Sequence, residues 1–552
     1  MFPTPSFVDR ISSDLQRDLL AFLPELILCG TIVALLLARL VTPLSKKHLG
    51  GFALLASTGS LASALCFWPE LPSPLGTVPL SGNVEGFSGL LVFDTFGLYL
   101  RMFLLVFLCC SLWLSLLTGI PDSEDSADYY TLLIGGILGM MLMVSANHLL
   151  MAFIAVEMAS VPSYALAGFL KGRRQGSEAA LKYVVYGASA SGVMLYGISL
   201  LAGNFGTGSL PLISQGFAQA SLGNGPTLPV LVGAICILIG LGFKLSAVPF
   251  HFWCPDVFEG AAAEVGAFLS VASKAAALAL TARLLFVFSG SSIAGPDDLS
   301  GNVLALGWAF LAAVTATFGN LAALAQTNVK RLLAYSTIAH AGFMMMAMVA
   351  IGPRSIGPLL YYISGYLLMN LGAFAIVALV RNRTGSENLD AFRGLIRRSP
   401  LLAVGMSIFL LSLLGMPPLV GFAAKFQVFA ALYETGRELG SHDGIFESVF
   451  FGLLIVAALN TAISAGYYLK LVKIMTLEEP ADATPFRVSI GSDALVSILA
   501  GLVLVAGMFW NPLTQMANRG SKSFDRLPQA EKPAKISIDV ARPVKGSKGK
   551  IE

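Results

Sequence analysis

Charged residues are scarce in this chain. They make up 12% of its 552 residues, whereas an ordinary soluble domain has roughly 25%. Hydrophobic residues account for 56%, and the mean hydropathy is +0.77. This composition excludes a soluble globular protein, and it excludes intrinsic disorder, which requires low hydrophobicity and a high net charge. The sequence is therefore that of a multi-pass membrane protein.

Cysteine is also rare, and neither sign of charge dominates. The six cysteines have no Cys-x-x-Cys spacing, so no iron–sulfur or zinc site is expected. The 35 basic and 32 acidic residues leave a net charge of +3, which predicts no nucleic-acid partner. There is no Walker A run, no Gly-x-Gly-x-x-Gly run after a strand, and no histidine pair with the spacing of a transmembrane haem site. We expect no cofactor in this chain.

Long apolar runs fill most of the sequence, and each spanning helix needs about 20 apolar residues. The runs predict an all-α fold of about fourteen transmembrane helices, with both termini on one side of the membrane. The expected spans are 20–41, 52–68, 89–117, 130–146, 148–170, 181–202, 230–253, 260–286, 302–325, 331–351, 356–380, 401–431, 449–469 and 490–511.

Lysine and arginine gather in the loops on one side of the membrane. Fifteen of them fall there: Lys46, Lys47, Lys171, Arg173, Arg174, Lys330, Arg331, Arg381, Arg383, Arg393, Arg397, Arg398, Lys470, Lys473 and Arg487. The N-terminus and the opposite loops hold four: Arg10, Arg17, Arg354 and Arg437. Because cytoplasmic loops are rich in positive charge, we expect the first side to be cytoplasmic and both termini to lie outside. The basic tail from Arg519 to Lys550 opposes this orientation, but a segment past the last span weighs less.

Two spans hold prolines near a single lysine. Lys244 precedes Pro249, and Lys425 follows Pro417 and Pro418. Proline lacks an amide proton and obstructs the carbonyl four residues earlier, so helices 7 and 12 should be broken. Their separation by five spans predicts two inverted five-helix repeats, formed by helices 4–8 and 9–13. The expected domains are helices 1–3 in 1–129, the repeats in 130–286 and 302–475, helix 14 in 490–511, and a basic, disordered tail in 512–552.

Charged side chains deep in the spans are the candidates for function, because an ionised group in hydrocarbon costs about 2.5 to 3.5 kcal/mol. Four stand out: Glu157, Lys244, Lys274 and Lys425. Structural interpretations stay open for them. Glu157 could be a hydrogen-bonded core carboxyl, Lys244 could extend to the membrane surface, and Lys425 could be an interfacial anchor. Lys274 is central and surrounded by alanines, which leaves space for water.

Two further residues are weaker candidates. Lys182 begins a span, where a solvated helix end is an equal alternative, and His340 suits either a satisfied core histidine or a proton relay. Burial favours the neutral form of a lysine, and a nearby carboxylate favours its charged form, so a lysine paired with a glutamate can take up and release a proton. The buried charges therefore predict a polar file that transports a small cation. The proton fits best, because lysine repels sodium.

Several motifs around these residues resemble a known family. They read VEMASVPSYALAGF, EAALKYVVYGASASGVMLYG, GFKLSAVPFHFWCPDVFEGAAAEVGAFLSVASK, KRLLAYSTIAHAGFM and LLGMPPLVGFAAKF. Together they resemble subunit N, also called subunit 2, of respiratory complex I, the NADH:quinone oxidoreductase. The related subunits L and M and the Mrp antiporter subunits usually read closer to WLPxAH where this chain has WCPDVFEG, so the resemblance is to subunit N.

The resemblance implies a role for most of the candidates. In the family, the glutamate matched by Glu157 pairs with the lysine matched by Lys244. Protons then pass by the lysine matched by Lys274 and finish at the one matched by Lys425, while Lys182 matches another family lysine.

The resemblance also implies the surroundings of the chain. The expected partners are antiporter-like subunits of the L and M type, small subunits of the K, J and A type, and the lipid bilayer, in a hetero-oligomer. FMN, iron–sulfur clusters and quinone are expected in partner subunits. A bacterial inner membrane is the expected location.

Two features depart from the family pattern. Many relatives read GAPxPV where this chain reads GAAAEVG, which places Glu264 where a neutral residue is usual. Glu264 could be a partner of the helix dipole or an added proton site. The extended basic tail is the second departure. Two other functions stay open: a subunit of a cation/proton antiporter or membrane-bound hydrogenase complex, and a non-conducting structural subunit of the membrane arm.

Overall fold

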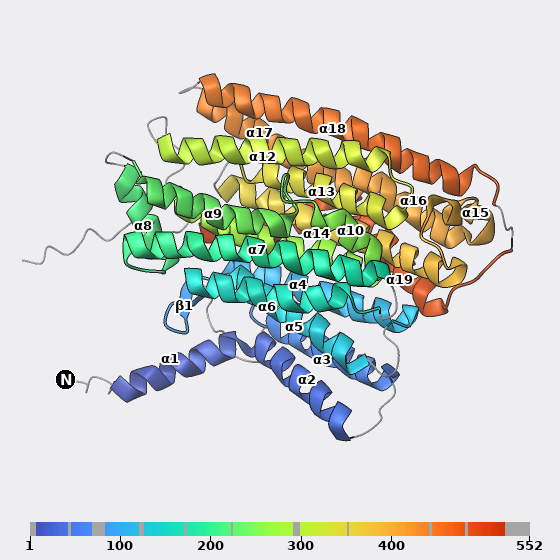
Figure 1. Ribbon diagram of the computed structural model, residues 1–552, viewed down its shortest axis with the longest axis horizontal. Helices are drawn as coiled ribbons and strands as arrows, with labels where there is room; N and C mark the ends of the chain where they lie inside the picture. The colour runs from blue at the N-terminus through green and yellow to red at the C-terminus, as the bar shows by residue number, and fades with distance from the viewer. Residues whose placement is uncertain are drawn as a thin grey trace, which may run out of the picture.

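The computed structural model describes residues 7–41, 46–68, 83–120, 126–170, 174–221, 225–290, 299–349, 353–440, 444–480 and 484–524. Helices make up almost all of these residues, and most of them lie side by side in one bundle (Figure 1). The sheet in this part of the chain is a short antiparallel hairpin of β1 (Val84–Gly86) and β2 (Leu91–Phe93). The expected all-α class is confirmed.

The helices follow the apolar runs closely. In the N-terminal half they are α1 (Phe7–Ala21), α2 (Leu23–Val41), α3 (Lys46–Leu65), α4 (Thr95–Thr118), α5 (Ser126–Ser145), α6 (Leu149–Ala167), α7 (Arg174–Phe205), α8 (Leu210–Ser221), α9 (Leu228–Leu245), α10 (Trp253–Gly260) and α11 (Ala263–Phe288). In the C-terminal half they are α12 (Leu299–Leu324), α13 (Val329–Ala347), α14 (Pro353–Thr384), η1 (Leu389–Phe392), α15 (Leu395–Arg398), α16 (Pro400–Leu414), α17 (Val420–Gly440), α18 (Gly444–Thr476), α19 (Ile490–Met508), α20 (Trp510–Ser521) and η2 (Lys522–Phe524).

A helix or a pair of helices lies at each of the fourteen expected ranges. Ten of the described helices are long and apolar enough to cross a membrane, and the bent pair of α1 and α2 makes up to eleven. The two helices of this pair meet at 70°. The count of fourteen and the inverted repeats stay predictions.

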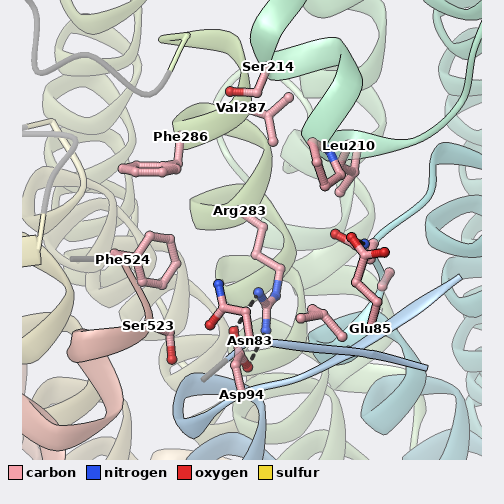
Figure 2. A pocket seen from close by; sticks show the side chains of 14 residues that line it. Asn83, Glu85, Asp94, Leu210, Ser214, Arg283, Phe286, Val287, Ser523 and Phe524 are labelled. Atoms are coloured by element: carbon pink, nitrogen blue, oxygen red, sulfur yellow. Dashed lines mark hydrogen bonds and ion pairs between the residues drawn. The ribbon is translucent and has the colours of Figure 1, made fainter. Parts of the chain in front are cut away.

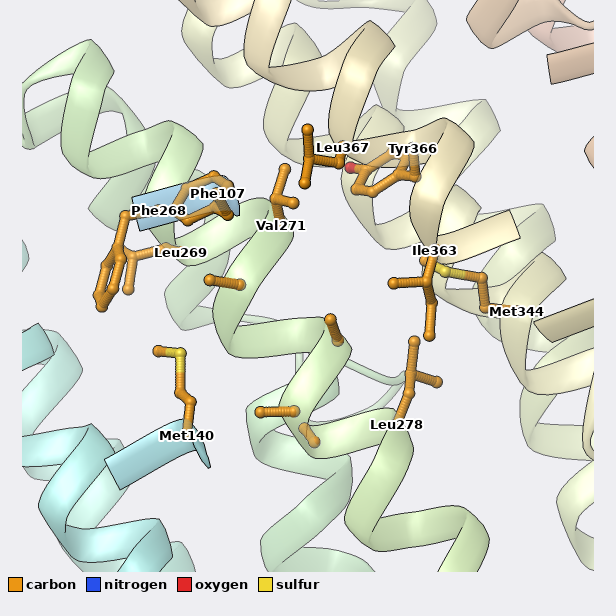
Figure 3. Packing of buried hydrophobic residues seen from close by; sticks show 14 of the residues in the cluster. Phe107, Met140, Phe268, Leu269, Val271, Leu278, Met344, Ile363, Tyr366 and Leu367 are labelled. Carbon is orange, nitrogen blue, oxygen red and sulfur yellow. The ribbon is translucent and has the colours of Figure 1, made fainter. Parts of the chain in front are cut away.

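The centre of the bundle is formed by α11 and α14, which are buried over almost their whole length. Figure 3 shows Val271 and Leu278 of α11 on the side of Leu367 and Ile363 of α14. Helix α11 also packs against α4, α5 and α9. A polar side chain near the middle of α11, such as Lys274, is therefore enclosed by protein.

Both proline-containing spans are broken. Helix α9 is followed by Ser246, which adopts a left-handed conformation with φ 57°, and α16 is followed by Gly415, with φ 93°. In each case the backbone N–H of this residue caps the preceding turn, as is common at helix C-termini. The helical path resumes at Trp253 and at Val420. The breaks expected from the prolines are present, and each leaves a helix end inside the bundle.

The chain after residue 508 differs from the expectation. Residues 512–524, assigned to a disordered tail, form most of α20 and all of η2, and α20 packs against α4 and α14. Phe524 contacts Phe96 and Phe286 edge to face, and this apolar anchor orders a segment that composition alone marks as polar. The remaining tail, 525–552, lies outside the described residues.

The same segment lines a cavity of about 250 Å³ through Ser523 and Phe524. Figure 2 shows Arg283 directed at Asp94 in this cavity, with Ser523 and Phe524 beside them. The guanidinium of Arg283 donates to both carboxylate oxygens of Asp94 at 2.8 and 2.9 Å. This paired geometry joins α11 to the start of α4.

Candidate functional site

Glu157 lies on α6 and is half-buried against α7. The hydroxyl of Ser191 on α7 donates a hydrogen bond to its carboxylate. Glu157 also lies close enough to Lys244 for an electrostatic interaction, although no direct hydrogen bond joins them. The carboxylate is therefore hydrogen-bonded and faces a lysine of a different helix.

Lys244 lies in the last turn of α9, beside the first break. Its side chain is 2% exposed, so it does not extend to the surface of the protein. Its Nζ atom contacts no hydrogen-bond acceptor in the described part of the chain. Because the carbonyl groups at a helix C-terminus carry partial negative charge, the end of α9 favours a cation at this position.

Lys274 lies near the middle of α11 and is 1% exposed. Its Nζ atom is 3.5 Å from the backbone carbonyl oxygen of Thr337 on α13, a long hydrogen bond. The side-chain oxygen of Thr337 accepts a hydrogen bond of 2.9 Å from Tyr366 on α14. Within the described residues, the ammonium group of Lys274 therefore makes a weak polar contact with a backbone carbonyl and no ion pair with a carboxylate.

His340 follows Thr337 on α13 by one turn and is fully enclosed. Its Nδ1 atom is 2.8 Å from the hydroxyl of Tyr362, and its Nε2 atom is 3.1 Å from the hydroxyl of Tyr468. Lys274 and Lys425 both lie close enough to His340 to interact with it electrostatically. The imidazole therefore lies between the two buried lysines, with a polar partner on each ring nitrogen.

Lys425 lies on α17, just after the second break, and is 4% exposed. Its Nζ atom donates a hydrogen bond of 2.9 Å to the carbonyl oxygen of Leu414, the last residue of α16. The same atom lies 4.7 Å from the centroid of the Phe343 ring, a cation–π contact. Like Lys244, Lys425 is a buried cation at the negative end of an interrupted helix.

The structure brings the candidates together in two groups, Glu157 with Lys244, and His340 with Lys274 and Lys425. Five of the six sequence candidates belong to these groups, on α6, α9, α11, α13 and α17. We call this set the buried file. The sequence-based candidates did not include Tyr362, Tyr468 and Thr337, which supply the hydroxyl and carbonyl contacts. Each of the three is a single polar residue in an apolar run, and this pattern indicates a functional contact only weakly.

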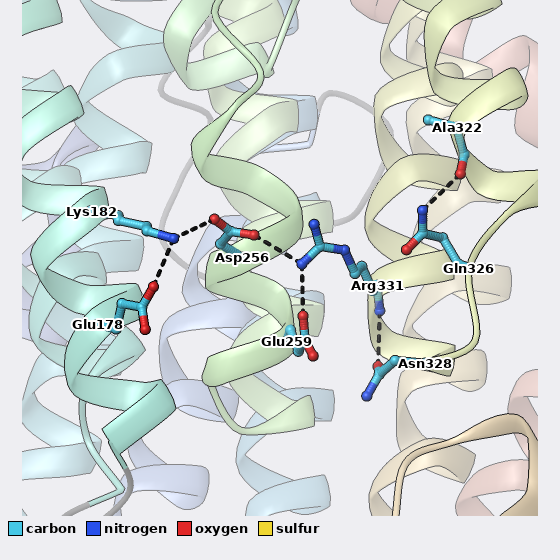
Figure 4. Close-up of polar contacts among 8 residues, drawn as sticks. All are labelled: Glu178, Lys182, Asp256, Glu259, Ala322, Gln326, Asn328 and Arg331. Atoms are coloured by element: carbon cyan, nitrogen blue, oxygen red, sulfur yellow. Dashed lines mark hydrogen bonds and ion pairs between the residues drawn. The ribbon is translucent and has the colours of Figure 1, made fainter.

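Lys182 lies apart from the buried file. Its ammonium group bonds Glu178 at 2.9 Å and Asp256 at 2.7 Å, and Asp256 bonds Arg331 at 2.9 Å (Figure 4). Arg331 also bonds Glu259 at 2.7 Å. These five residues form the surface cluster, which joins α7, α10 and α13 and lines a cavity of about 190 Å³. The sequence could have indicated this cluster, because the acidic residues Asp256 and Glu259 both lie within the apolar run WCPDVFEG.

Glu264 lies in the first turn of α11 and is 3% exposed. Neither of its carboxylate oxygens has a hydrogen-bond partner among the described residues. Nearby, the buried Lys330 donates to the carbonyl of Ala261 at 2.7 Å and pairs with Glu387 at 2.8 Å. Lys330 is a functional candidate that sequence reasoning assigned only to a loop.

The comparisons with known proteins agree on one family. A family model described as NADH:quinone oxidoreductase/Mrp antiporter, TM, matches residues 146–450. NADH-quinone oxidoreductase subunit N of Anaeromyxobacter sp. (strain Fw109-5) is 36% identical over 539 residues, which cover 94% of this chain and 99% of the relative. This chain belongs to the subunit N family of NADH-quinone oxidoreductase. NAD(P)H-quinone oxidoreductase subunit 2 of Thermosynechococcus vestitus is 35% identical over 93% of this chain and 94% of its own.

Solved structures show the same fold. A chain of respiratory complex I from Thermus thermophilus is 31% identical, with a TM-score of 0.70 over 90% of this chain and 99% of its own. A chain of the Mrp complex from Dietzia sp. DQ12-45-1b is 17% identical, with a TM-score of 0.77 over 92% of this chain and 97% of its own. The second likeness is one of fold alone. As a member of the subunit N family, this chain is a membrane subunit of an NADH:quinone oxidoreductase, and the expected resemblance is confirmed.

Proposed function

We propose that this chain moves protons through the membrane arm of its complex and couples that movement to quinone reduction. The observation that carries the proposal is the buried file. Lys244, Lys274 and Lys425 are each at most 4% exposed, and none of the three forms an ion pair within the described residues. Burying a charge without a partner is costly, so such lysines are expected where the charge itself is used.

The contacts along the file suit a proton that moves in steps. A neutral lysine amine can accept a proton and a charged one can donate it, while a nearby carboxylate such as Glu157 stabilises the charged form. His340 can accept a proton on one ring nitrogen and release it from the other, and its two tyrosine partners hold the ring in place. The helix ends beside Lys244 and Lys425 stabilise a positive charge at each break.

The surroundings of the chain follow from the family. We propose that it assembles with the antiporter-like L and M type and the small K, J and A type membrane subunits in a bacterial inner membrane, with both termini outside. FMN, iron–sulfur clusters and quinone belong to partner subunits in this proposal. The repeats in 130–286 and 302–475 would each contribute one broken helix to the file.

The proposal is tested in sealed membrane vesicles carrying Lys274→Met. NADH-driven proton uptake and quinone reduction are recorded together, and the amount of assembled complex is measured by native electrophoresis. We expect assembly to persist and both rates to fall together. Assembled complex with wild-type proton uptake would overturn the proposal and favour a structural subunit. Purification without an NADH-oxidising module would instead favour an antiporter or hydrogenase complex.

A further inference from the structure

Glu264 is the buried charge that the file does not explain. Glu264 is 3% exposed, and both of its carboxylate oxygens lack a hydrogen-bond donor among the described residues. Burying a carboxyl group without a hydrogen-bond partner is costly, which makes Glu264 a candidate for function. A role limited to the helix dipole does not require such complete burial, because dipole partners act at exposed helix ends too.

Titratable groups face Glu264 from two neighbouring helices. Lys330 on α13 and Tyr129 on α5 both lie close enough for an electrostatic interaction with its carboxyl group. Lys330 is already engaged with Glu387, which also pairs with Arg381 at 3.3 Å. Tyr129 contacts Ser115 through its hydroxyl at 2.9 Å. Lys330 is therefore already paired with Glu387, and Glu264 has no ion-pair partner among the described residues.

Along the chain, Glu264 follows the surface cluster and precedes Lys274 of the buried file. The cavity of the surface cluster extends to Gly260, four residues before Glu264, and its wall includes Lys182 and Arg331. On the other side, Lys274 lies ten residues further along α11, which corresponds to about 15 Å of helix. Glu264 is thus the carboxyl group nearest in sequence to the central lysine, and it follows the last cavity-lining residue of α10 by four positions.

Polar side chains occupy the distance between Glu264 and Lys274. Ser270 is fully buried on α11, one turn before Lys274, and accepts a hydrogen bond of 2.6 Å from Asn370 on α14. The Oδ1 atom of Asn370 has no hydrogen-bond donor among the described residues. The two Glu264 oxygens are likewise unpartnered. Buried acceptors of this kind are normally satisfied, often by ordered water, so Glu264 and Asn370 each present an acceptor that suits a water molecule.

We propose that Glu264 is a proton-carrying site that connects the cavity of the surface cluster with Lys274. In the forward step the O–H bond of the Glu264 carboxyl group breaks, water held by Ser270 and Asn370 accepts this proton and passes one of its own on, and an N–H bond forms on the neutral amine of Lys274. The carboxylate is then reloaded from the cavity. This inference rests on the proposed function of the buried file, and it adds an entry site at a position where the family usually keeps a neutral residue.

The test compares four variants of the full complex in sealed vesicles: Glu264→Gln, Glu264→Asp, Glu479→Gln and Lys274→Met. Proton uptake and quinone reduction are recorded across the pH range in which the complex is stable. Glu264→Gln keeps the shape and removes the titratable group, and Glu264→Asp restores a carboxyl group. Glu479→Gln removes an exposed carboxyl group that pairs only at the surface, and it is the matched control.

For Glu264→Gln we expect both rates to fall by about tenfold. This loss is smaller than the roughly hundredfold loss that follows removal of an essential acid–base group. The loss of rate should grow as pH rises, because protons become scarce. Glu264→Asp should recover most of the rate, and Glu479→Gln should match the wild type. Wild-type rates at every pH for assembled Glu264→Gln, with collapsed rates for Lys274→Met, overturn this inference alone. Wild-type rates for both overturn the proposed function as well. A pH-independent loss that Glu264→Asp does not recover indicates a packing role and also overturns the inference.

Discussion

The Nζ atom of Lys425 donates a hydrogen bond of 2.9 Å to the carbonyl oxygen of Leu414, across the break between α16 and α17. A helix normally leaves its last carbonyl groups unpaired, and here a buried cation from the next helix satisfies one of them. The positive charge of Lys425 therefore lies at a helix end where the backbone has partial negative charge. The break exposes the carbonyl group that binds the lysine, so the position of Lys425 depends on the break.

Lys425→Met should lower proton uptake and quinone reduction by about tenfold or more, because it removes the charge that the account requires at this end of the file. The Leu414 carbonyl loses its partner as well, so Lys425→Arg is the matched control for that contact. We expect Lys425→Arg to keep assembly while transport stays impaired, since arginine does not release its proton. Quinone reduction and vesicle acidification, measured on assembled complex, check this. Full activity of Lys425→Met would contradict the role of Lys425.

Tyr468→Phe should lower transport moderately. The change removes the hydroxyl that contacts His340 Nε2 and Ser336, while the ring and its packing are kept. The loss of one such hydrogen bond is worth about 0.5 to 1.5 kcal/mol, which corresponds to about two- to tenfold in rate if it acts on the proton step. Tyr361→Phe is the control, because the Tyr361 hydroxyl donates to the backbone carbonyl of Ala506 at 3.0 Å. Equal rates for the two variants would mean that the His340 contact does not influence transport.

The buried ion pair between Arg101 and Glu25 should matter for stability rather than for transport. Arg101→Met leaves the Glu25 carboxylate, 1% exposed, without its partner, which costs about 3 to 5 kcal/mol for a buried pair. The thermal midpoint of the purified complex and the yield of the subunit should both drop. The double variant Arg101→Met with Glu25→Met removes both charges and should recover much of the loss. A double variant whose loss of stability equals the sum of the losses in Arg101→Met and Glu25→Met would show that the two residues act independently.

Lys182 should be less important than its place in the family pattern implies. Its ion pairs with Glu178 and Asp256 lie at the surface of the protein, with 38% of the lysine side chain exposed, and exposed pairs contribute little. We expect Lys182→Met to assemble normally and to retain most proton uptake. A collapse of transport comparable to that of Lys274→Met would place Lys182 in the file after all.

Much of the fold could be predicted from the sequence because its determinants are local. Apolar runs of about 20 residues specify where helices cross the membrane. Pro249, Pro417 and Pro418 mark the breaks because proline acts on its own turn of helix. The buried charges Lys244 and Lys274 stand out for the same reason, since a single charge in an apolar run is visible without any knowledge of its neighbours.

The contacts between helices could not be predicted from local pattern. The carbonyl of Thr337 that faces Lys274, the tyrosines around His340 and the pair of Asp256 with Arg331 join residues far apart in sequence. The ordered structure of α20 and η2 also depends on distant residues, because Phe524 packs against Phe96 and Phe286. Packing of distant segments determines these features, and one sequence does not show it.

The most direct test of the account uses Lys244→Met in sealed membranes, with Lys470→Met, at an exposed lysine of α18, as the matched lysine control. NADH-driven proton uptake and quinone reduction are measured beside the amount of assembled complex. Lys244 is buried without a hydrogen-bond acceptor among the described residues, so methionine fits its apolar stem and removes only the charge. The account predicts intact assembly with a joint collapse of both rates in Lys244→Met alone. Intact assembly with both rates at the wild-type level would contradict it.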